Sequence, residues 1–227
     1  PKNSLICGLN SAVLFFYSRD IGYTAYVKRG ASGGGSLHGW NGGVTFIEEF
    51  GSDEEDAFKN YVERMSGEGD VGRWMRRLQP CFLAQFYDKR ILFTHADVPI
   101  DAGSHSKIRE FTREFAKHMS TDTAVFGGTQ IKYGDRQLIR GDTIFWERRF
   151  EELGQNEVDG LVEELGVDYL VVGHTPHERI TSFFGKIFDI DVGMTPRYGE
   201  GEPAAIVFNR DGVRGFYADG GETRIDE

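Results

Sequence analysis

The sequence predicts an α/β protein, and three observations lead to that prediction. Two short apolar runs, at residues 91–93 and 169–172, are each followed by a histidine two residues later and then by a proline, as buried strands end at turns. Apolar residues between positions 57 and 65 recur at three- and four-residue spacing, which is typical of an amphipathic helix. Three more apolar runs lie between residues 186 and 217, so we expect a strand-rich carboxyl end.

The remaining elements follow from local signals of capping, spacing and turn chemistry. Ser52-Asp-Glu-Glu55 is a candidate capping box, and Asn156 is a candidate cap for a helix that Gly166 ends. Residues 209–212 read Asn-Arg-Asp-Gly, a hairpin turn. We predict strands over residues 4–7, 81–86, 91–93, 169–172, 186–192, 204–208 and 213–217, and helices over residues 52–65, 108–119 and 156–165.

The chain is expected to form a single domain over residues 1–227, because no repeat or linker-like tract divides it. A glycine-rich segment at residues 30–43 lacks the Gly-Lys-Ser/Thr ending of a phosphate-binding loop, so it is predicted to be a surface loop.

Composition excludes several classes of protein. A formal charge of −10 over 227 residues argues against nucleic acid as a partner. No run of about 18 apolar residues occurs, so no membrane partner is expected. Cys7 and Cys81 do not make a disulfide framework, which favours a cytoplasmic location.

The two strand-end histidines, His95 and His174, are the candidate functional residues. Open α/β sheets place their chemistry at the carboxyl ends of strands. Two imidazoles from separate strands suit Mn, Fe or Zn, and no Cys-x-x-Cys offers a local zinc finger instead. Taken singly, each histidine has an ordinary alternative as a hydrogen-bonded turn residue.

These residues belong to an ordered set of motifs that resembles the calcineurin-like metallophosphoesterases, in their phosphoprotein-phosphatase branch. Phe93-Thr-His-Ala96 and Val172-Gly-His-Thr-Pro176 resemble the two distal histidine motifs of that family. Trp40-Asn-Gly-Gly-Val-Thr45, Phe145-Trp-Glu-Arg148 and Ile190-Asp-Val-Gly-Met194 are similar to the segments around them, in the same order. The resemblance implies a β-sandwich flanked by helices and a metal-dependent phosphatase activity.

The departures from the family pattern are at the amino-terminal end. Neither Asp-x-His nor Gly-Asp-x-x-Asp occurs in the sequence, and the family's Gly-Asn-His-Glu is replaced by Gly8-Leu-Asn-Ser11. Asn10 therefore stands where the family has its catalytic histidine. The resemblance implies a distal portion of such an enzyme, without its amino-terminal βαβ units, whose isolated chain is impaired or needs a partner chain to complete the fold.

The resemblance also implies roles for individual residues. The site would hold one or two divalent ions, and His95 and His174 would both bind the same ion. Arg148 would bind the phosphoryl oxygens. Asp97 and Asp191 are candidates to orient a ligating histidine. His177 and Asn10 are weaker candidates, for a ligand and for a residue near the site. The ordinary alternatives are a solvated helix face for Arg148 and turn caps for the two aspartates.

Three functions stay open on the sequence alone. The first is a metal-dependent hydrolase of phosphomonoesters, with a Ser/Thr phosphoprotein or a small phosphoester as substrate. The second is a non-catalytic descendant of the fold that binds or regulates. The third is a dinucleoside polyphosphate hydrolase, because fold does not decide substrate.

Overall fold

The computed structural model divides the chain into two units, each described here by itself. The sheet unit comprises Pro1–Asn10, Pro80–Thr112 and Ile139–Glu227, and the helix unit comprises Ser11–Gln79 and Arg113–Leu138. The residues that the structure describes are 5–7, 47–65, 68–75, 79, 81–98, 109–110, 112–113, 132–133, 136–137, 144, 147–194, 199 and 201–227.

The sheet unit contains nine of the described strands and one long helix. Its strands are β1 (Leu5–Cys7), β2 (Cys81–Phe86), β3 (Lys89–Thr94), β6 (Tyr169–Val172), β7 (Thr181–Phe183), β8 (Ile187–Asp189), β9 (Ala204–Asn209), β10 (Gly212–Tyr217) and β11 (Glu222–Arg224). Its helices are the 3-10 turn η2 (Phe150–Glu152) and α6 (Gln155–Leu165). The strands form a five-stranded sheet in the order β2-β3-β6-β8-β7 and a four-stranded sheet in the order β1-β9-β10-β11.

Parallel pairing is confined to the middle of the five-stranded sheet. Strand β6 runs parallel to β3 on one side and to β8 on the other, while the edge strands β2 and β7 are antiparallel to their neighbours. The buried run Leu170–Val172 is apolar throughout, as expected for a strand covered on both faces. The carboxyl ends of β3 and β6 therefore meet at one edge of this sheet.

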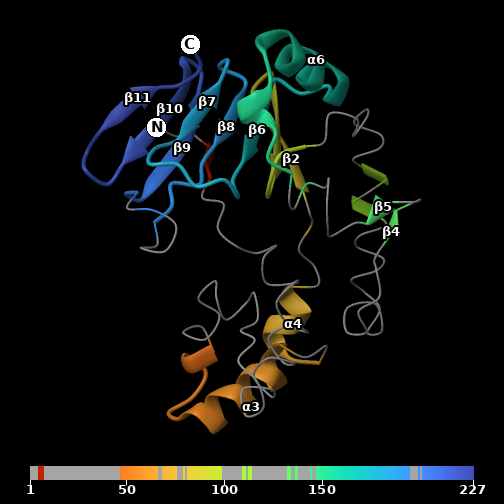
Figure 1. The fold of residues 1–227 in the computed structure, drawn as a ribbon, viewed down its shortest axis with the longest axis vertical. Coiled ribbons are helices and arrows are strands. Elements are labelled where there is room, and N and C mark those ends of the chain that lie inside the picture. The colour runs from red at the N-terminus through yellow and green to blue at the C-terminus, as the bar shows by residue number, and fades with distance from the viewer. Residues whose placement is uncertain are drawn as a thin grey trace. The chain divides into compact units, whose positions relative to one another are not determined.

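The two sheets share one apolar core. Ile91, Val171 and Phe188 of the five-stranded sheet lie in the same buried cluster as Ile206 and Phe208 of the four-stranded sheet. Helix α6 lies on the other side of the five-stranded sheet (Figure 1). It buries the residues that the sequence predicted as its inner face, namely Val158, Leu161, Val162 and Leu165.

Helix and turn boundaries depart from the predictions by one or two residues. Helix α3 (Glu54–Met65) begins after Asp53, whose Oδ1 accepts the N–H of Asp56 at 2.9 Å, so Asp53 is the cap in place of Ser52. Helix α6 begins after Gly154, whose N–H donates to Glu157 Oε2 at 2.8 Å, so Asn156 lies inside the helix. Gly166 ends α6 at φ +65°, as predicted.

The strand predictions are confirmed at β1, β2, β3, β6, β9 and β10, and the hairpin turn at residues 209–212 joins β9 to β10. Strands β7 and β11 were missed. Each has three residues, and β11 is exposed throughout, so neither carries an apolar run. The predicted strand over residues 186–192 ends at Asp189, a buried carboxylate whose acceptor atoms are used by the turn that follows.

The helix unit contains α3, α4 (Asp70–Met75) and a two-stranded ladder of β4 (Lys132–Tyr133) and β5 (Arg136–Gln137). The predicted apolar face of α3 is confirmed, because Ala57, Tyr61 and Met65 are buried. Tyr61 and Met65 form a small cluster with Ile47.

The α/β class is confirmed by these elements, and the β-sandwich flanked by helices is replaced by this mixed sheet facing an antiparallel sheet. Predictions for residues 30–43, for the helix over 108–119 as a whole and for Asn10 lie outside the described residues. The single domain over residues 1–227 stays a prediction, as does the cytoplasmic location. In the part of the chain that is described, no helix has the length and apolar character to cross a membrane.

The shared core gives a test of stability. Phe188 is 0% exposed and contacts Phe208 across the two sheets, with ring centroids 6.1 Å apart. We expect Phe188→Ala to lower the free energy of unfolding by about 3–5 kcal/mol, because it leaves a cavity in the cluster. Urea unfolding followed by circular dichroism measures this.

The matched control is Phe216→Ala, since Phe216 is 38% exposed on β10. Its cost should stay below about 1 kcal/mol. Equal losses from the two substitutions would contradict the assignment of Phe188 to a core that both sheets share.

Candidate functional site

Strand pairing brings the two predicted histidines to the same edge of the sheet. In the parallel ladder of β3 and β6, Phe93 lies opposite Val171, and each strand then ends within one or two residues. Gly173 N–H donates to the carbonyl oxygen of His95 at 3.0 Å, which extends the pairing beyond the strands. His95 and His174 are thereby presented side by side on consecutive turns.

The two imidazoles form a hydrogen-bonded pair. His95 Nε2 lies 3.2 Å from His174 Nδ1, and the ring centroids are 4.9 Å apart at an interplanar angle of 59°. His174 has a φ of +77°, a left-handed conformation that costs a residue with a Cβ atom about 1 kcal/mol or more. The tight turn before Pro176 holds the ring in this position despite that cost.

Burial keeps both rings neutral. Loss of hydration lowers the pKa of His95 to about 4, against a smaller opposing effect from the carboxylate of Asp191. Loss of hydration also lowers the pKa of His174 to about 3, and the neighbouring His95 and Arg148 act in the same direction. At neutral pH the pair therefore carries no charge.

A neutral pair has a fixed hydrogen-bonding capacity. Each ring holds one N–H, and one of these lies in the bond between His95 Nε2 and His174 Nδ1. The outer nitrogens, His95 Nδ1 and His174 Nε2, then carry one N–H and one lone pair between them, in either tautomer. The pair is able to donate one hydrogen bond and accept one proton at the same time.

Arg148 lies on a turn that is tied to the His95 loop. Ala96 N–H donates to the Ile144 carbonyl at 2.8 Å, and Asp97 N–H donates to the Glu147 carbonyl at 3.2 Å. The Arg148 side chain is exposed, and its charge is felt by both imidazoles, since it lowers the pKa of each. It is on an irregular segment before η2, not on the solvated helix face that was the alternative.

The buried carboxylate of Asp97 stabilises this turn through a hydrogen bond. Its side chain is 3% exposed, and Oδ2 accepts the N–H of Phe150 at 2.7 Å. Loss of hydration raises the pKa of Asp97 to about 7, and the nearby carboxylates of Asp189 and Glu147 add to the rise, against the stabilising backbone N–H groups. Asp97 therefore positions the segment that carries Arg148.

His177 and Asp191 occupy the turns behind the imidazole pair. His177 Nε2 lies 3.5 Å from Asp189 Oδ2, and that carboxylate raises the pKa of His177. Asp191 N–H donates to Asp189 Oδ1 at 2.9 Å, and Asp191 Oδ1 accepts the Gly193 N–H at 3.0 Å. A side chain at Gly173 would begin 3.6 Å from Asp191 Cβ, so Asp191 borders the turn between the histidines.

Asp189 and Glu147 were missed by the sequence predictions. Asp189 is 2% exposed and Glu147 is 7% exposed, and burial raises the pKa of Asp189. A signal was present for Asp189, because it follows the apolar pair Ile187-Phe188 in a predicted strand, where a carboxylate is out of place. Glu147 stands among charged residues and gave no such signal.

Comparison with known proteins finds solved structures of similar fold. No model of a known protein family matches the chain, and no curated protein matches it. A solved cold-active protein-tyrosine phosphatase of the psychrophile Shewanella sp. has a similar fold: it is 16% identical, with a TM-score of 0.53 over 73% of this chain and 48% of that chain.

Two other solved structures of cold-active protein tyrosine phosphatase are similar. One is 15% identical, with a TM-score of 0.54 over 79% of this chain and 55% of that chain. The other, a point mutant, is 17% identical, with a TM-score of 0.58 over 94% of this chain and 63% of that chain. This chain thus spans between about half and two thirds of the length of these neighbours, and the likeness establishes the fold.

Two predictions are corrected by these findings. The calcineurin-like metallophosphoesterase assignment is wrong, because the solved structures that share the fold are described as protein-tyrosine phosphatases. The predicted divalent ions (Mn, Fe or Zn) are wrong on the same comparison, and the described residues contain no group of three or more His, Cys, Asp or Glu side chains that could hold a metal ion.

The neutral imidazole pair gives a test in solution. We expect the Cε1–H resonances of His95 and His174 to keep their neutral chemical shifts from pH 8 down to about 5, because their pKa values are about 4 and 3. Nuclear magnetic resonance titration, with each signal assigned by a histidine-to-asparagine variant, measures this.

His177 is the internal reference, because the Asp189 carboxylate raises its pKa above the ordinary 6.5 and it should be charged at pH 6. Titration of all three rings near pH 6.5 would contradict the burial described for the pair.

Asp97 gives a second test, in stability against pH. Its pKa is about 7 in the folded chain, against roughly 3.9 in an unfolded chain, so the folded state binds a proton more tightly. Its contribution should therefore be lost as pH rises from about 4 to 7, by up to about 4 kcal/mol. Asp97→Asn, which keeps an acceptor oxygen, should flatten this fall when urea unfolding is compared at pH 5 and pH 8.

The control is Asp70→Asn in the helix unit. Hydrogen bonding from Arg64 lowers the pKa of Asp70 to about 2, which is outside this pH window. Asp70→Asn should leave the fall in the free energy of unfolding between pH 5 and pH 8 unchanged. An equally steep fall in Asp97→Asn would show that Asp97 ionises normally.

Proposed function

We propose that this chain supplies the phosphate-binding and proton-transferring part of a phosphatase-type hydrolase of phosphomonoesters. The observation that carries the proposal is a neutral imidazole pair beside an exposed arginine, at strand ends of a fold whose solved neighbours are phosphatases. The proposal does not invoke a metal ion.

Arg148 is proposed to bind the phosphoryl group. Its guanidinium is planar, is always charged, and offers parallel N–H donors that match two phosphate oxygens. It is exposed, so a substrate reaches it without a change of fold, and its charge already acts on His95 and His174. A phosphate held there would lie next to both rings.

The imidazole pair is proposed to handle the proton of the attacking water. The water oxygen attacks phosphorus, the ester P–O bond breaks, and the water proton passes to the outer nitrogen of the pair that carries the lone pair. The outer N–H of the other ring donates to a phosphoryl oxygen or to the leaving oxygen. A bound phosphate dianion would raise the pKa of both rings, which makes the acceptor nitrogen a stronger base at the moment it is needed.

The other candidate residues are proposed to position this machinery. Asp97 fixes the backbone of Phe150 and hence the turn that carries Arg148. Asp191 borders Gly173 and stabilises charge on His95, since its carboxylate acts to raise the pKa of that ring. His177 is held by Asp189 behind the pair. Asn10 lies outside the described residues and stays a prediction.

The neighbours direct the choice of substrate. They are named as protein-tyrosine phosphatases, so an aryl phosphomonoester, including phosphotyrosine in a protein, replaces Ser/Thr phosphoprotein as the first substrate to test. Because this chain spans only 48–63% of their lengths, the activity of the whole neighbour is a proposal for this chain, and so is the partner chain predicted to complete the fold.

A second candidate is phosphate-group binding without turnover, the non-catalytic module of the sequence analysis. One observation favours it: rings with pKa values of about 4 and 3 are weak bases in the absence of ligand. If a bound phosphate does not raise those values, the site binds and does not hydrolyse. The same experiment separates the two candidates.

The experiment measures turnover of p-nitrophenyl phosphate and of a phosphotyrosine peptide with EDTA present. We expect Arg148→Ala and His174→Asn each to lower kcat/KM by about 100-fold, because each removes an interaction with the reacting phosphoryl group. The matched control is Arg214→Gln, which removes an arginine that pairs with Glu222 on the neighbouring strand.

Four outcomes are informative. Loss in both site variants with a normal control supports the hydrolase. No turnover by the parent, together with phosphate binding that depends on Arg148, supports the binding module. Equal turnover in all variants would indicate a contaminating phosphatase and would contradict the proposal. Turnover that EDTA abolishes would overturn the metal-free form of it.

A further inference from the structure

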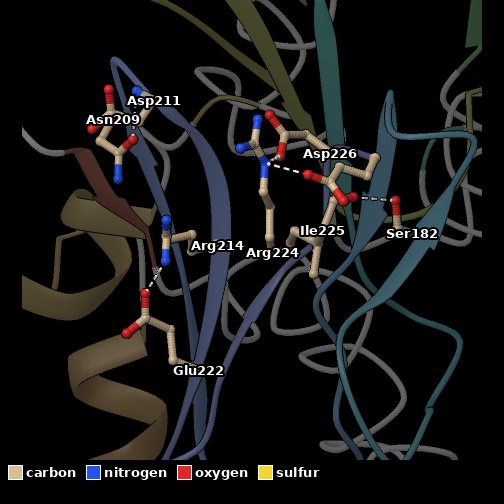
Figure 2. Close-up of polar contacts among 9 residues, drawn as sticks. Ser182, Asn209, Asp211, Arg214, Glu222, Arg224, Ile225 and Asp226 are labelled. Carbon is tan, nitrogen blue, oxygen red and sulfur yellow. Dashed lines mark hydrogen bonds and ion pairs between the residues drawn. The ribbon is translucent and has the colours of Figure 1, made fainter.

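A cavity lies at the opposite end of strands β3 and β6 from the histidine pair. It has a volume of about 790 Å³ and opens between the β2–β3 turn and the β9–β10 turn, entirely within the sheet unit. This volume is within the range of pockets that hold small molecules. The polar residues of one rim, Asn209, Asp211, Arg224 and Asp226, are drawn in Figure 2.

The cavity is separate from the candidate site. Ile91 and Tyr169 line it, and they are partners in the parallel ladder of β3 and β6. His95 comes four residues after Ile91, just beyond the end of β3, which is about 13 Å away at the rise of an extended strand. The same two strands thus begin at the cavity and end at the imidazole pair.

The walls of the cavity are aromatic. Phe86 and Tyr87 form one pair, with ring centroids 4.6 Å apart, and Tyr169 and Phe208 form another at 5.7 Å. All four line the cavity. Ring faces and edges of this kind favour a planar aromatic occupant, which gains stacking energy beyond the apolar area that it buries.

One cation on the wall lacks a carboxylate partner within the part of the chain that the structure describes. The guanidinium carbon of Arg210 lies 4.6 Å from the centroid of the Tyr87 ring, and its described contacts include no ion pair. The other cations are paired: Lys89 with Asp168 at 3.2 Å, and Arg224 with Asp226 at 2.9 Å. The donors of Arg210 are therefore available to an anionic ligand.

The Tyr169 hydroxyl adds a second donor. It makes no hydrogen bond to the described residues, and its ring forms part of the wall. Burial raises its pKa, so the hydroxyl keeps its proton at neutral pH. The rim acids Asp88 and Asp211, which form no ion pair with a described residue, are exposed, and so is Arg210. Arg210 differs from them because its guanidinium is stacked on the Tyr87 ring, which holds its donors at the aromatic wall.

We propose that this cavity binds a small planar aromatic molecule that carries one anionic group. The ring lies against the aromatic walls, and the anion is held by Arg210 with a hydrogen bond from Tyr169. The site is independent of phosphate hydrolysis, because none of its residues belongs to the candidate site. The anionic group is a carboxylate or a sulfonate or phosphate of the same charge type, and the guanidinium would recognise each of them.

The test uses three probes with one ring system: 1-naphthoate, neutral 1-naphthalenemethanol and cationic 1-naphthylmethylammonium. Isothermal titration calorimetry on the full chain measures each affinity. We expect naphthoate to bind about tenfold more tightly than the neutral probe, because it adds a charge-assisted hydrogen bond. Arg210→Gln should abolish that preference and leave the neutral probe unchanged, and Tyr169→Phe should weaken naphthoate alone.

Two matched controls keep the result specific. Arg214→Gln removes an arginine of the adjacent strand that does not line the cavity, and Arg148→Ala removes the proposed phosphate-binding residue. Both should bind naphthoate as the parent does, whether or not the parent hydrolyses phosphate. Equal binding of the three probes, tighter binding of the ammonium, no binding at all, or an unchanged affinity in Arg210→Gln would each overturn the proposal.

Discussion

The parallel pairing of β3 with β6 is the constraint on which the rest of the site depends. Because the two strands run in the same direction and in register, the residues that follow them leave the sheet at the same edge. The hydrogen bond from Gly173 to His95 then carries the pairing one step into the turns. Without this pairing, two histidines 79 residues apart would have no reason to meet.

The cost of the arrangement is the burial of ionisable groups. His95 and His174 are pushed toward their neutral forms, and so are Asp97 and Asp189, all by loss of hydration. Backbone N–H groups and His177 offset part of this cost at the two aspartates. An anionic ligand bound beside the two rings would favour their protonated forms, because an opposite charge nearby raises the pKa of an imidazole.

The sheet unit therefore has two chemically different ends. At the carboxyl ends of β3 and β6 are polar turns with an imidazole pair and an exposed arginine. At their amino ends is an aromatic cavity whose cation is stacked on a ring. Both ends belong to strands that pack on the one apolar core between the sheets.

The sequence by itself determined the α/β class, the apolar face of α3 and α6, most of the long strands and the histidines at strand ends. These features follow from local signals: periodicity, the residue before a proline, and glycine after a helix. The short strands β7 and β11, the buried acids Asp189 and Glu147, and the cavity wall made by Tyr87 and Arg210 depended on the tertiary structure. Each of these features depends on contacts between residues that are far apart in the sequence. Such contacts produce no local sequence pattern from which they could be predicted. The predicted divalent ions were wrong because they came from a family resemblance, and the solved structures that share the fold are described as protein-tyrosine phosphatases. Residue types at strand ends predict which atoms are present, whereas the fold decides that the two rings form a hydrogen bond with each other.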